Sequence, residues 1–388
     1  MIPYGRQDIT QADIDAVTEV LRSSFLTQGP AVPAFEQAVA ARVGAKYAVA
    51  VNSATSALHI ACLALDLGPG DLLWTVPNTF VASANCGRYC GADVDFVDID
   101  PLTWNMSVDC LRAKLEQAAG AGRVPKVVVP VHFSGQSTQA QEIHALARQY
   151  GFKVIEDASH SIGASRNGEP VGSCRWSDIT VFSFHPVKIV TTAEGGMALT
   201  NDPALAERLR LLRSHGITRD PARLQREAAP AWYYEQQILG FNYRMTDVHA
   251  CLGTSQLGRL EQYVSRRNQL AARYDAALEQ LPLQLPTVSA GNRSAFHLYV
   301  VRLQLARIAV SHRQVFDALR DRGIGVNLHY SPVHLQPYYR ELGFGPGYCP
   351  HAETYADEAI TLPLFAAMTD VEQDEVVAAL RSVLCLKG

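Results

Sequence analysis

The strongest constraint on the fold is a repeated alternation of short apolar runs with helix-like segments, which fills much of the first half of the chain. Apolar runs at 47–51, 72–76, 95–97, 127–131 and 153–157 have the length of buried strands. Such an alternation predicts a mostly parallel sheet with helices on both faces. The expected fold class is therefore α/β.

The pattern changes after residue 177. Two apolar runs, 179–184 and 196–200, are separated by a loop too short for a crossover helix. That loop contains Lys188. A long helix is expected at 256–281, where apolar residues recur on one face and prolines follow.

The start of this long helix is taken as the boundary between two domains. Residues 1–255 are expected to form a large domain together with the N-terminal segment, and residues 256–388 a smaller α+β domain. In the smaller domain, the last helix is expected to begin with a capping box formed by Thr369 and Glu372.

Composition excludes several classes of protein. The 388 residues include 34 Lys and Arg against 38 Asp and Glu, a net charge of -4, so there is no basic field for nucleic acid or an anionic membrane. Without a leader-like start or a membrane-length apolar run, a soluble, cytoplasmic protein is expected. The cysteines lack a CxxC pair and are expected to be reduced. They are Cys62, Cys86, Cys90, Cys110, Cys174, Cys251, Cys349 and Cys385.

Common catalytic and nucleotide-binding motifs are absent from the sequence. The glycines do not form GxGxxG between a strand and a helix, and there is no Walker loop, HExxH or GxSxG. The histidines show no recognised metal-ligand spacing, so no metal is expected.

Polar residues follow two of the expected strands. Residues 52–57 (NSATSA) open a helix after a strand, where backbone N–H groups and the helix dipole favour a phosphate. An ordinary helix cap explains the same residues. Asp157 ends another strand and could pair with a pyridinium nitrogen, while His160 could hold that carboxylate or lie against the ring. A capping Asp and a buried, hydrogen-bonded His are the alternatives.

Two further segments carry candidate residues. Lys188 lies between two core strands, where burial favours the neutral amine that Schiff-base chemistry needs, although loop lysines are more often solvated. Ser183 could add a hydroxyl to a phosphate site. Arg244 has the planar fork that binds oxyanions, and a surface ion pair is its alternative role.

In their order and spacing, these motifs resemble the DegT/StrS-type sugar aminotransferases, pyridoxal phosphate enzymes with the aspartate-aminotransferase fold (fold type I). The resemblance covers nearly the whole chain, from LTQGP at 26–30 through NSATSAL at 52–58 and EDASH at 156–160 to the segment of Lys188, HYSPVH at 329–334 and LPL at 362–364. It implies the cofactor pyridoxal 5'-phosphate.

The resemblance also implies roles for individual residues. Lys188 would bond to the cofactor aldehyde and act as the catalytic base, and Asp157 would pair with the pyridine nitrogen. Asn242 would reach the phosphate of the neighbouring subunit, so the active sites of a homodimer would be shared. The other expected cofactor contacts are Ala54, Thr55, Phe80, His160 and Ser183. Arg244, His329 and Tyr330 are expected to bind substrate.

Within the family, the segments 1–7 and 184–196 look most like the C4 aminotransferases of the pseudaminic acid pathway. These transfer an amino group from L-glutamate to a UDP-linked 4-keto-6-deoxy-N-acetylhexosamine. Other nucleotide keto sugars, such as a UDP-4-keto-pentose or a dTDP or GDP keto sugar, are alternatives. A regulatory member without activity and a sugar dehydratase are also considered. Lys188 disfavours both, since the dehydratases typically have histidine there.

Overall fold

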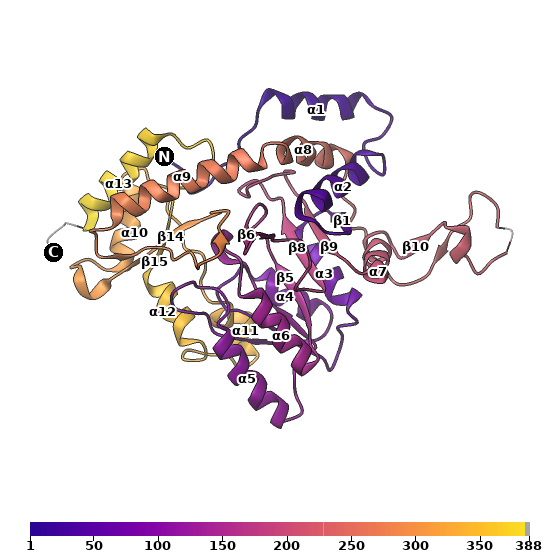
Figure 1. Cartoon of the computed structure of the whole chain (residues 1–388), viewed down its shortest axis with the longest axis horizontal. Helices are drawn as coiled ribbons and strands as arrows, with labels where there is room; N and C mark the ends of the chain where they lie inside the picture. The colour runs from indigo at the N-terminus through magenta and orange to yellow at the C-terminus, as the bar shows by residue number, and fades with distance from the viewer. Residues whose placement is uncertain (228, 385–388) are drawn as a thin grey trace.

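A sheet forms the centre of the molecule. The computed structural model describes residues 1–227 and 229–384. The strands of the sheet are β1 (Tyr47–Val51), β2 (Leu72–Thr75), β3 (Asp93–Phe96), β4 (Val127–Val129), β5 (Lys153–Asp157), β8 (Ile179–Ser183) and β9 (Gly196–Thr200). They form a seven-stranded sheet in the order β1-β9-β8-β5-β4-β2-β3. Figure 1 labels β1, β9, β8 and β5 in the middle of the molecule. Strand β9 runs antiparallel to both of its neighbours and the other four pairs are parallel, which confirms the expected mostly parallel sheet.

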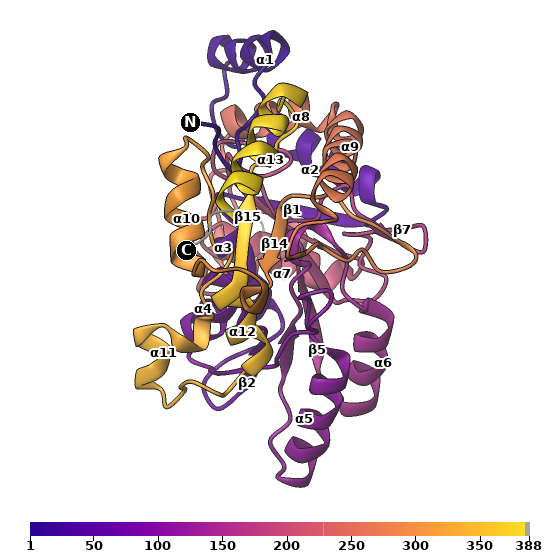
Figure 2. The ribbon, with the colours of Figure 1, turned by 90° about the vertical axis from the view of Figure 1, so that its left-hand side faces the viewer.

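Helices cover both faces of this sheet. They are α2 (Ala31–Val43), α3 (Ala54–Ala64), α4 (Ala82–Tyr89), α5 (Val108–Gly120), α6 (Ala140–Tyr150) and α7 (Pro203–Arg213). Contacts join α3 to α4 and α7, and α5 to α6. Figure 2 shows α4 and α6 on opposite sides of β2 and β5. This follows from right-handed crossovers, because the chain moves one way along the sheet through α3 and α4 and returns through α5 and α6.

The pairing brings several strand ends to one edge of the sheet. Because β9 is antiparallel to both β1 and β8, and β8 is parallel to β5, the carboxyl ends of β1, β5 and β8 lie on the same side. Strand β9 begins at this edge, opposite the end of β8. Ligands of open α/β sheets gather at such an edge.

The prediction of one long helix at 256–281 is wrong. The structure has two helices, α8 (Asp247–Leu257) and α9 (Leu260–Leu278), with Arg259 non-helical between them. The Arg259 guanidinium contacts the carboxylate of Asp13 at 2.6 Å, and that carboxylate is buried in α1 (Gln11–Arg22). At this break, the Arg259 guanidinium pairs with the buried Asp13 carboxylate. The spacing of apolar residues in the sequence does not reveal this ion pair.

A smaller antiparallel sheet lies toward the C-terminus. Strands β12 (Leu283–Gln284), β14 (Tyr299–Leu303) and β15 (Ala359–Leu362) form it, with β14 in the middle. Its apolar residues pack with the second half of α9, with α10 (His312–Asp321) and with α13 (Asp370–Leu384). Ile2 joins this cluster from the other end of the chain. The first half of α9 packs with the large sheet, and a domain boundary between 255 and 256 stays a prediction.

The capping box expected at Thr369 and Glu372 is present, and α1 begins with another one. Thr10 and Asp13 bond to each other's backbone N–H groups at the start of α1, as Thr369 and Glu372 do at α13.

The remaining elements are β6 (Ser165–Arg166), β7 (Glu169–Pro170), β10 (Ile217–Thr218), β11 (Glu235–Gln236), β13 (Asn292–Arg293), α11 (Pro337–Glu341), α12 (Pro350–Glu358), η1 (Phe133–Gly135), η2 (Pro221–Arg223), η3 (Leu305–Arg307) and η4 (Val333–Leu335).

The cysteines of the described residues are free thiols, as expected, and Cys385 lies outside that part of the chain. Within residues 1–227 and 229–384, no helix combines the length and apolar character needed to cross a bilayer.

Candidate active site

The largest described cavity at the carboxyl edge of the sheet has a volume of about 510 Å³. Residues at or just after the ends of β1, β5 and β8 line it, together with His297, which precedes β14, and residues 327–330. Of the residues expected to bind cofactor or substrate, those that line the cavity are Ala54, Thr55, Phe80, Asp157, His160, Ser183, Lys188, His329 and Tyr330. The structure therefore gathers most of the predicted site around one space.

Lys188 lies in the loop between β8 and β9 at this cavity. Backbone hydrogen bonds close the base of the loop, from Phe184 N–H to the Gly195 carbonyl and from Thr192 N–H to the Phe184 carbonyl. Although the residue keeps some surface open to the cavity, burial lowers the pKa of Lys188 to about 8, and the negative charge of Asp157 opposes this shift. A lysine with a lowered pKa has an appreciable neutral fraction near pH 7, as a nucleophilic amine requires.

Asp157 is the last residue of β5 and is buried. Its Oδ1 accepts hydrogen bonds from the Ser159 N–H at 3.1 Å and the Ser159 hydroxyl at 2.6 Å. Its Oδ2 accepts a hydrogen bond from the Ser83 hydroxyl at 2.6 Å. Three donors thus fix the carboxylate, whose negative charge suits a cationic ring nitrogen in the cavity.

The N-terminus of α3 forms another part of the cavity wall. Ser53 caps this helix by accepting from Ser56 N–H, so the capping interpretation of the sequence is correct. The first helical residues, Ala54 and Thr55, nevertheless line the cavity. Gly196 permits the close approach of β9, because a Cβ there would lie 2.4 Å from the Ala54 nitrogen. Capping and anion binding are therefore compatible at one helix end.

His160 and Tyr330 are joined across the cavity wall. The Nδ1 of His160 accepts a hydrogen bond from Ser134 N–H at 3.2 Å, so a neutral ring carries its proton on Nε2. That Nε2 lies 3.1 Å from the Tyr330 hydroxyl oxygen and donates to it. Burial, with further contributions from the charges of Lys188 and His329, lowers the pKa of His160 well below its usual value. The ring is therefore neutral at pH 7.

The other predicted residues on this wall are also uncharged or apolar. Burial, with the nearby charge of Lys188, lowers the pKa of His329 to about 3, and its Nδ1 lies 2.9 Å from the Thr361 hydroxyl. Burial raises the pKa of Tyr330, which stays a phenol. Phe80 has 59% of its surface exposed, and its ring centroid lies 6.5 Å from that of Tyr330.

Asn242 and Arg244 do not line this cavity in their own chain. The segment that contains them runs beside the end of β1, where Asn52 N–H donates to the Tyr243 carbonyl. Arg244 lines a separate hollow of about 260 Å³, and its Nη1 donates to the Ser214 hydroxyl at 3.1 Å. Their expected roles toward ligands stay predictions.

Among the residues of the site that the sequence did not reveal are Ser83 and His297. Ser83 contacts Asp157, but α4, which carries it, was not expected because its sequence is short and largely polar. His297 lines the cavity from the segment before β14. Its sequence neighbours are ordinary strand residues, so only the tertiary structure reveals its position.

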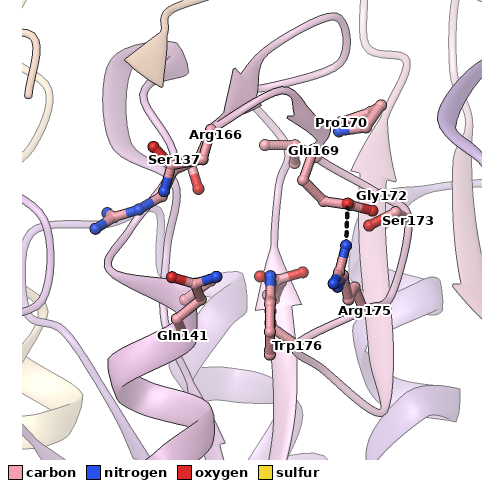
Figure 3. A pocket seen from close by; sticks show the side chains of 13 residues that line it. Ser137, Gln141, Arg166, Glu169, Pro170, Gly172, Ser173, Arg175 and Trp176 are labelled. Atoms are coloured by element: carbon pink, nitrogen blue, oxygen red, sulfur yellow. Dashed lines mark hydrogen bonds and ion pairs between the residues drawn. The ribbon is translucent and has the colours of Figure 1, made fainter. Parts of the chain in front are cut away.

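A second cavity, of about 250 Å³, is lined by residues of α6 and of the segment 166–176 (Figure 3). Glu156 lines this cavity, whereas the adjacent Asp157 lines the larger one. Arg175 pairs with Glu169 at 2.9 Å, as the dashed line in Figure 3 shows. Arg166 pairs with Glu142 at 3.3 Å. The smaller cavity is therefore walled by charges that are already paired.

The fold and the larger cavity are those of pyridoxal phosphate enzymes of fold type I, in which a lysine and an aspartate face each other at the carboxyl edge of the sheet. Residues 7–381 match the DegT/DnrJ/EryC1/StrS aminotransferase family, and the chain belongs to that family.

Similar proteins support this assignment. The chain is 40% identical to the spore coat polysaccharide biosynthesis protein SpsC of Bacillus subtilis, over 99% of this chain and 97% of SpsC. The structure of Helicobacter pylori PseC, an aminotransferase of pseudaminic acid biosynthesis, superposes with a TM-score of 0.90 at 28% identity over 99% of each chain. The PLP form of Streptococcus pneumoniae Spr1654 superposes with a TM-score of 0.87 at 29% identity over 98% of each chain.

Pyridoxal phosphate is the cofactor of this family, and the residues of the cavity fit it. The helix N-terminus at Ala54 and the Ser183 hydroxyl suit an anionic phosphate, and Asp157 suits a protonated ring nitrogen. Lys188 supplies an amine whose lowered pKa suits reaction with an aldehyde. No group of three or more potential metal ligands occurs among the residues that the structure describes.

Proposed function

We propose that this protein transfers an amino group from L-glutamate to C4 of a UDP-linked 4-keto-6-deoxy-N-acetylhexosamine, as in pseudaminic acid biosynthesis. The observation that carries the chemistry is a single cavity that holds Lys188, with its lowered pKa, and Asp157 at the end of β5. The similarity to PseC over 99% of the chain supports the choice of sugar.

The residues of the cavity have different roles in the proposed reaction. Pyridoxal phosphate supplies an aldehyde that accepts the amino group and a ring that accepts electrons. Lys188 would hold the cofactor until the donor arrives, and its freed amine would then take the proton from the donor's α-carbon. Asp157 keeps a proton on the pyridine nitrogen, and Ser83 and Ser159 hold Asp157 in place.

Other residues of the cavity would bind and orient the cofactor and the substrate. Ala54, Thr55 and Ser183, which line the cavity, would hold the phosphate through backbone N–H groups and a hydroxyl, and Phe80 would pack against the ring. His160 lies on the same wall and directs the Tyr330 hydroxyl through its Nε2 proton. His329 and Tyr330 contact substrate, and the low pKa of His329 keeps its imidazole uncharged there.

The proposal includes a homodimer with shared active sites. Asn242 is exposed and does not line the cavity of its own chain, which supports a contact of this residue with the phosphate held by a second copy. A segment with β10 and β11 projects from the body of the molecule (Figure 1). It exposes 79% of Trp232 and 80% of Leu239, which a second copy would cover. Size-exclusion chromatography with light scattering tests for twice the chain mass.

A related sugar substrate is the second candidate. SpsC has a higher identity to this chain than PseC, 40% against 28%, and is named for spore coat polysaccharide biosynthesis. This similarity favours a sugar of a surface polysaccharide, which includes other UDP, dTDP or GDP keto sugars. In either case the reaction would take place in the cytoplasm.

Product analysis tests the proposed function. The purified protein is loaded with pyridoxal phosphate and incubated with L-glutamate and a panel of UDP, GDP and dTDP keto sugars. We expect 2-oxoglutarate and an amino sugar to form in equal amounts, fastest with the UDP-linked N-acetylhexosamine. If an amino sugar forms only from a different nucleotide sugar, the proposed substrate is wrong. If no amino sugar forms from any of them, the proposed aminotransferase activity is wrong.

A further inference from the structure

His297 is a buried residue of the active-site cavity to which no role has been assigned so far. It is 4% exposed and lines the cavity that contains Lys188. Its Nδ1 is buried without a hydrogen-bond partner in the described chain. A buried polar group without a partner is costly, so a ligand in the cavity is the natural partner of this imidazole.

The position of His297 is fixed by its backbone. The buried guanidinium of Arg267 donates from Nη1 to the carbonyl oxygens of Phe296 and His297, at 3.1 and 3.2 Å. The backbone of Gly135 packs against the same segment, because a Cβ there would lie 2.6 Å from the Phe296 nitrogen. The imidazole is thus held in place before any ligand binds, which lowers the entropic cost of binding.

A second free donor lies close to His297. The ring centroids of His297 and His160 are 4.5 Å apart, and His160 in turn donates to the Tyr330 hydroxyl oxygen. Because Tyr330 accepts that bond and stays protonated, its own proton is available to a ligand. His297 and Tyr330 therefore offer two hydrogen-bond donors on either side of His160.

The cavity lacks the group that most often binds a carboxylate. No arginine lines it among the residues that the structure describes. An amino acid that exchanges its amino group beside Lys188 must place its α-carboxylate close by, because the two groups share one carbon. Burial and, after it, the charge of Lys188 lower the pKa of His297, and both residues line the same cavity.

We propose that His297 binds the α-carboxylate of the amino-acid donor, with the Tyr330 hydroxyl as the second hydrogen-bond donor. This inference rests on the proposed function, since it assumes a donor that reacts at Lys188. A pair of neutral donors would hold the carboxylate of each incoming amino acid and release the keto acid without the strong binding of an arginine fork.

The test is equilibrium binding to the cofactor-loaded protein. The probe is 2-methyl-L-glutamate, which has no α-hydrogen and therefore cannot be turned over, and its 1-amide serves as the partner probe without an α-carboxylate. Calorimetry gives the Kd of each. Wild-type protein should bind the acid at least about tenfold more tightly than the 1-amide, the effect of one hydrogen bond to a charged group.

Two substitutions at His297 separate binding from folding. His297→Leu should weaken binding of the acid about tenfold and leave that of the 1-amide unchanged, whereas His297→Gln, which keeps an N–H donor, should restore most of the loss. The control is His351→Leu, at an exposed histidine of α12 that does not line the cavity. It should bind like the wild type.

Three results would overturn the inference. These are an unchanged Kd for the acid in His297→Leu, an equal loss for acid and 1-amide, and a loss of pyridoxal phosphate affinity alone. The proposed function fails separately, if the wild-type protein forms no amino sugar in the product assay. Amino sugar formation together with unchanged acid binding in His297→Leu would reject the inference alone.

Discussion

Glu156 and Asp157 are adjacent at the end of β5, yet they face different cavities. Asp157 lines the cavity of about 510 Å³ and Glu156 that of about 250 Å³, because successive side chains of a strand point to opposite faces. Burial alone would raise the pKa of Glu156, but His132 and hydrogen bonds from Thr180 and Ser177 lower it. Glu156 is thus paired within the chain, whereas Asp157 is placed to meet a ligand.

The cations of the two cavities differ in the same way. Around the smaller cavity, Arg175 and Arg166 each have a carboxylate partner. Lys188 forms no ion pair within 4.0 Å in the part of the chain that the structure describes, and its amine has a lowered pKa. One side of β5 therefore serves stability, and the other keeps groups free for chemistry.

Lys188→Ala should have the largest effect. Removing the amine removes both the group that holds the cofactor and the base that moves the proton, so amino transfer should fall by at least ~10³-fold. The visible absorbance of the cofactor-loaded protein should also be lost. Both are measured by spectroscopy and a coupled 2-oxoglutarate assay, and full activity of this variant would contradict the proposed role.

Asp157→Asn should have the next largest effect. An amide cannot keep the pyridine nitrogen protonated, so turnover should fall by about 10²-fold or more while bound cofactor is retained. Glu156→Gln, one residue away, should keep turnover within about threefold. Equal losses in the two variants, measured as kcat at saturating substrate, would remove the distinction between the two sides of β5.

The pH dependence of cofactor uptake tests the state of Lys188. Only the neutral amine attacks an aldehyde, so with a pKa of about 8 the rate should rise with pH, about tenfold per unit below 8, and level off above it. The rate is followed by the visible absorbance after mixing the apo-protein with pyridoxal phosphate. A small lysine derivative run in parallel corrects for titration of the cofactor. A rise that continues to pH 10 would show an unperturbed lysine.

Glu156→Gln should lower stability instead of activity. The Nδ1 of His132 accepts from Thr138 N–H, so its Nε2 carries a proton toward Glu156 Oε1 at 3.4 Å. In the glutamine variant, an NH₂ group at the position of Oε1 would face the His132 proton, which is a second donor. An NH₂ group at the position of Oε2 would lose the hydrogen bonds that Ser177 and Thr180 donate there. The free energy of unfolding should fall by about 1–3 kcal/mol, measured in urea. Unchanged stability would mean that the pairing is unimportant.

Arg175→Ala should have the smallest effect. The side chains of Arg175 and Glu169 are 60% and 30% exposed, so water screens their ion pair. Stability should change by about 0.5 kcal/mol or less, with turnover unaffected. Large losses of activity would show that the smaller cavity takes part in the reaction.

Much of the fold could be predicted from the sequence because its strands are short and apolar and alternate with amphipathic helices. The expected runs at 47–51 and 153–157 coincide with β1 and β5. The break between α8 and α9 could not be predicted, because it depends on the distant Asp13. Sequence periodicity reports which face is buried and not which charge must be neutralised.

The candidate site was predictable where a residue ends a strand, as Asp157 and Ser183 do, or where a family motif marks it, as for Lys188. Residues that reach the cavity through long-range contacts gave no local signal. Ser83 bonds to Asp157 from 74 positions away, and His160 meets Tyr330 across 170. His297 was missed for the same reason.

The most direct test of the account is the identity of the lysine that bonds to pyridoxal phosphate. The loaded protein is reduced with borohydride, digested and analysed by mass spectrometry. We expect the reduced pyridoxyl group on Lys188 alone, with the visible absorbance lost on reduction. A label on another lysine, such as the exposed Lys46, or no covalent label in a protein saturated with the cofactor, would contradict the account.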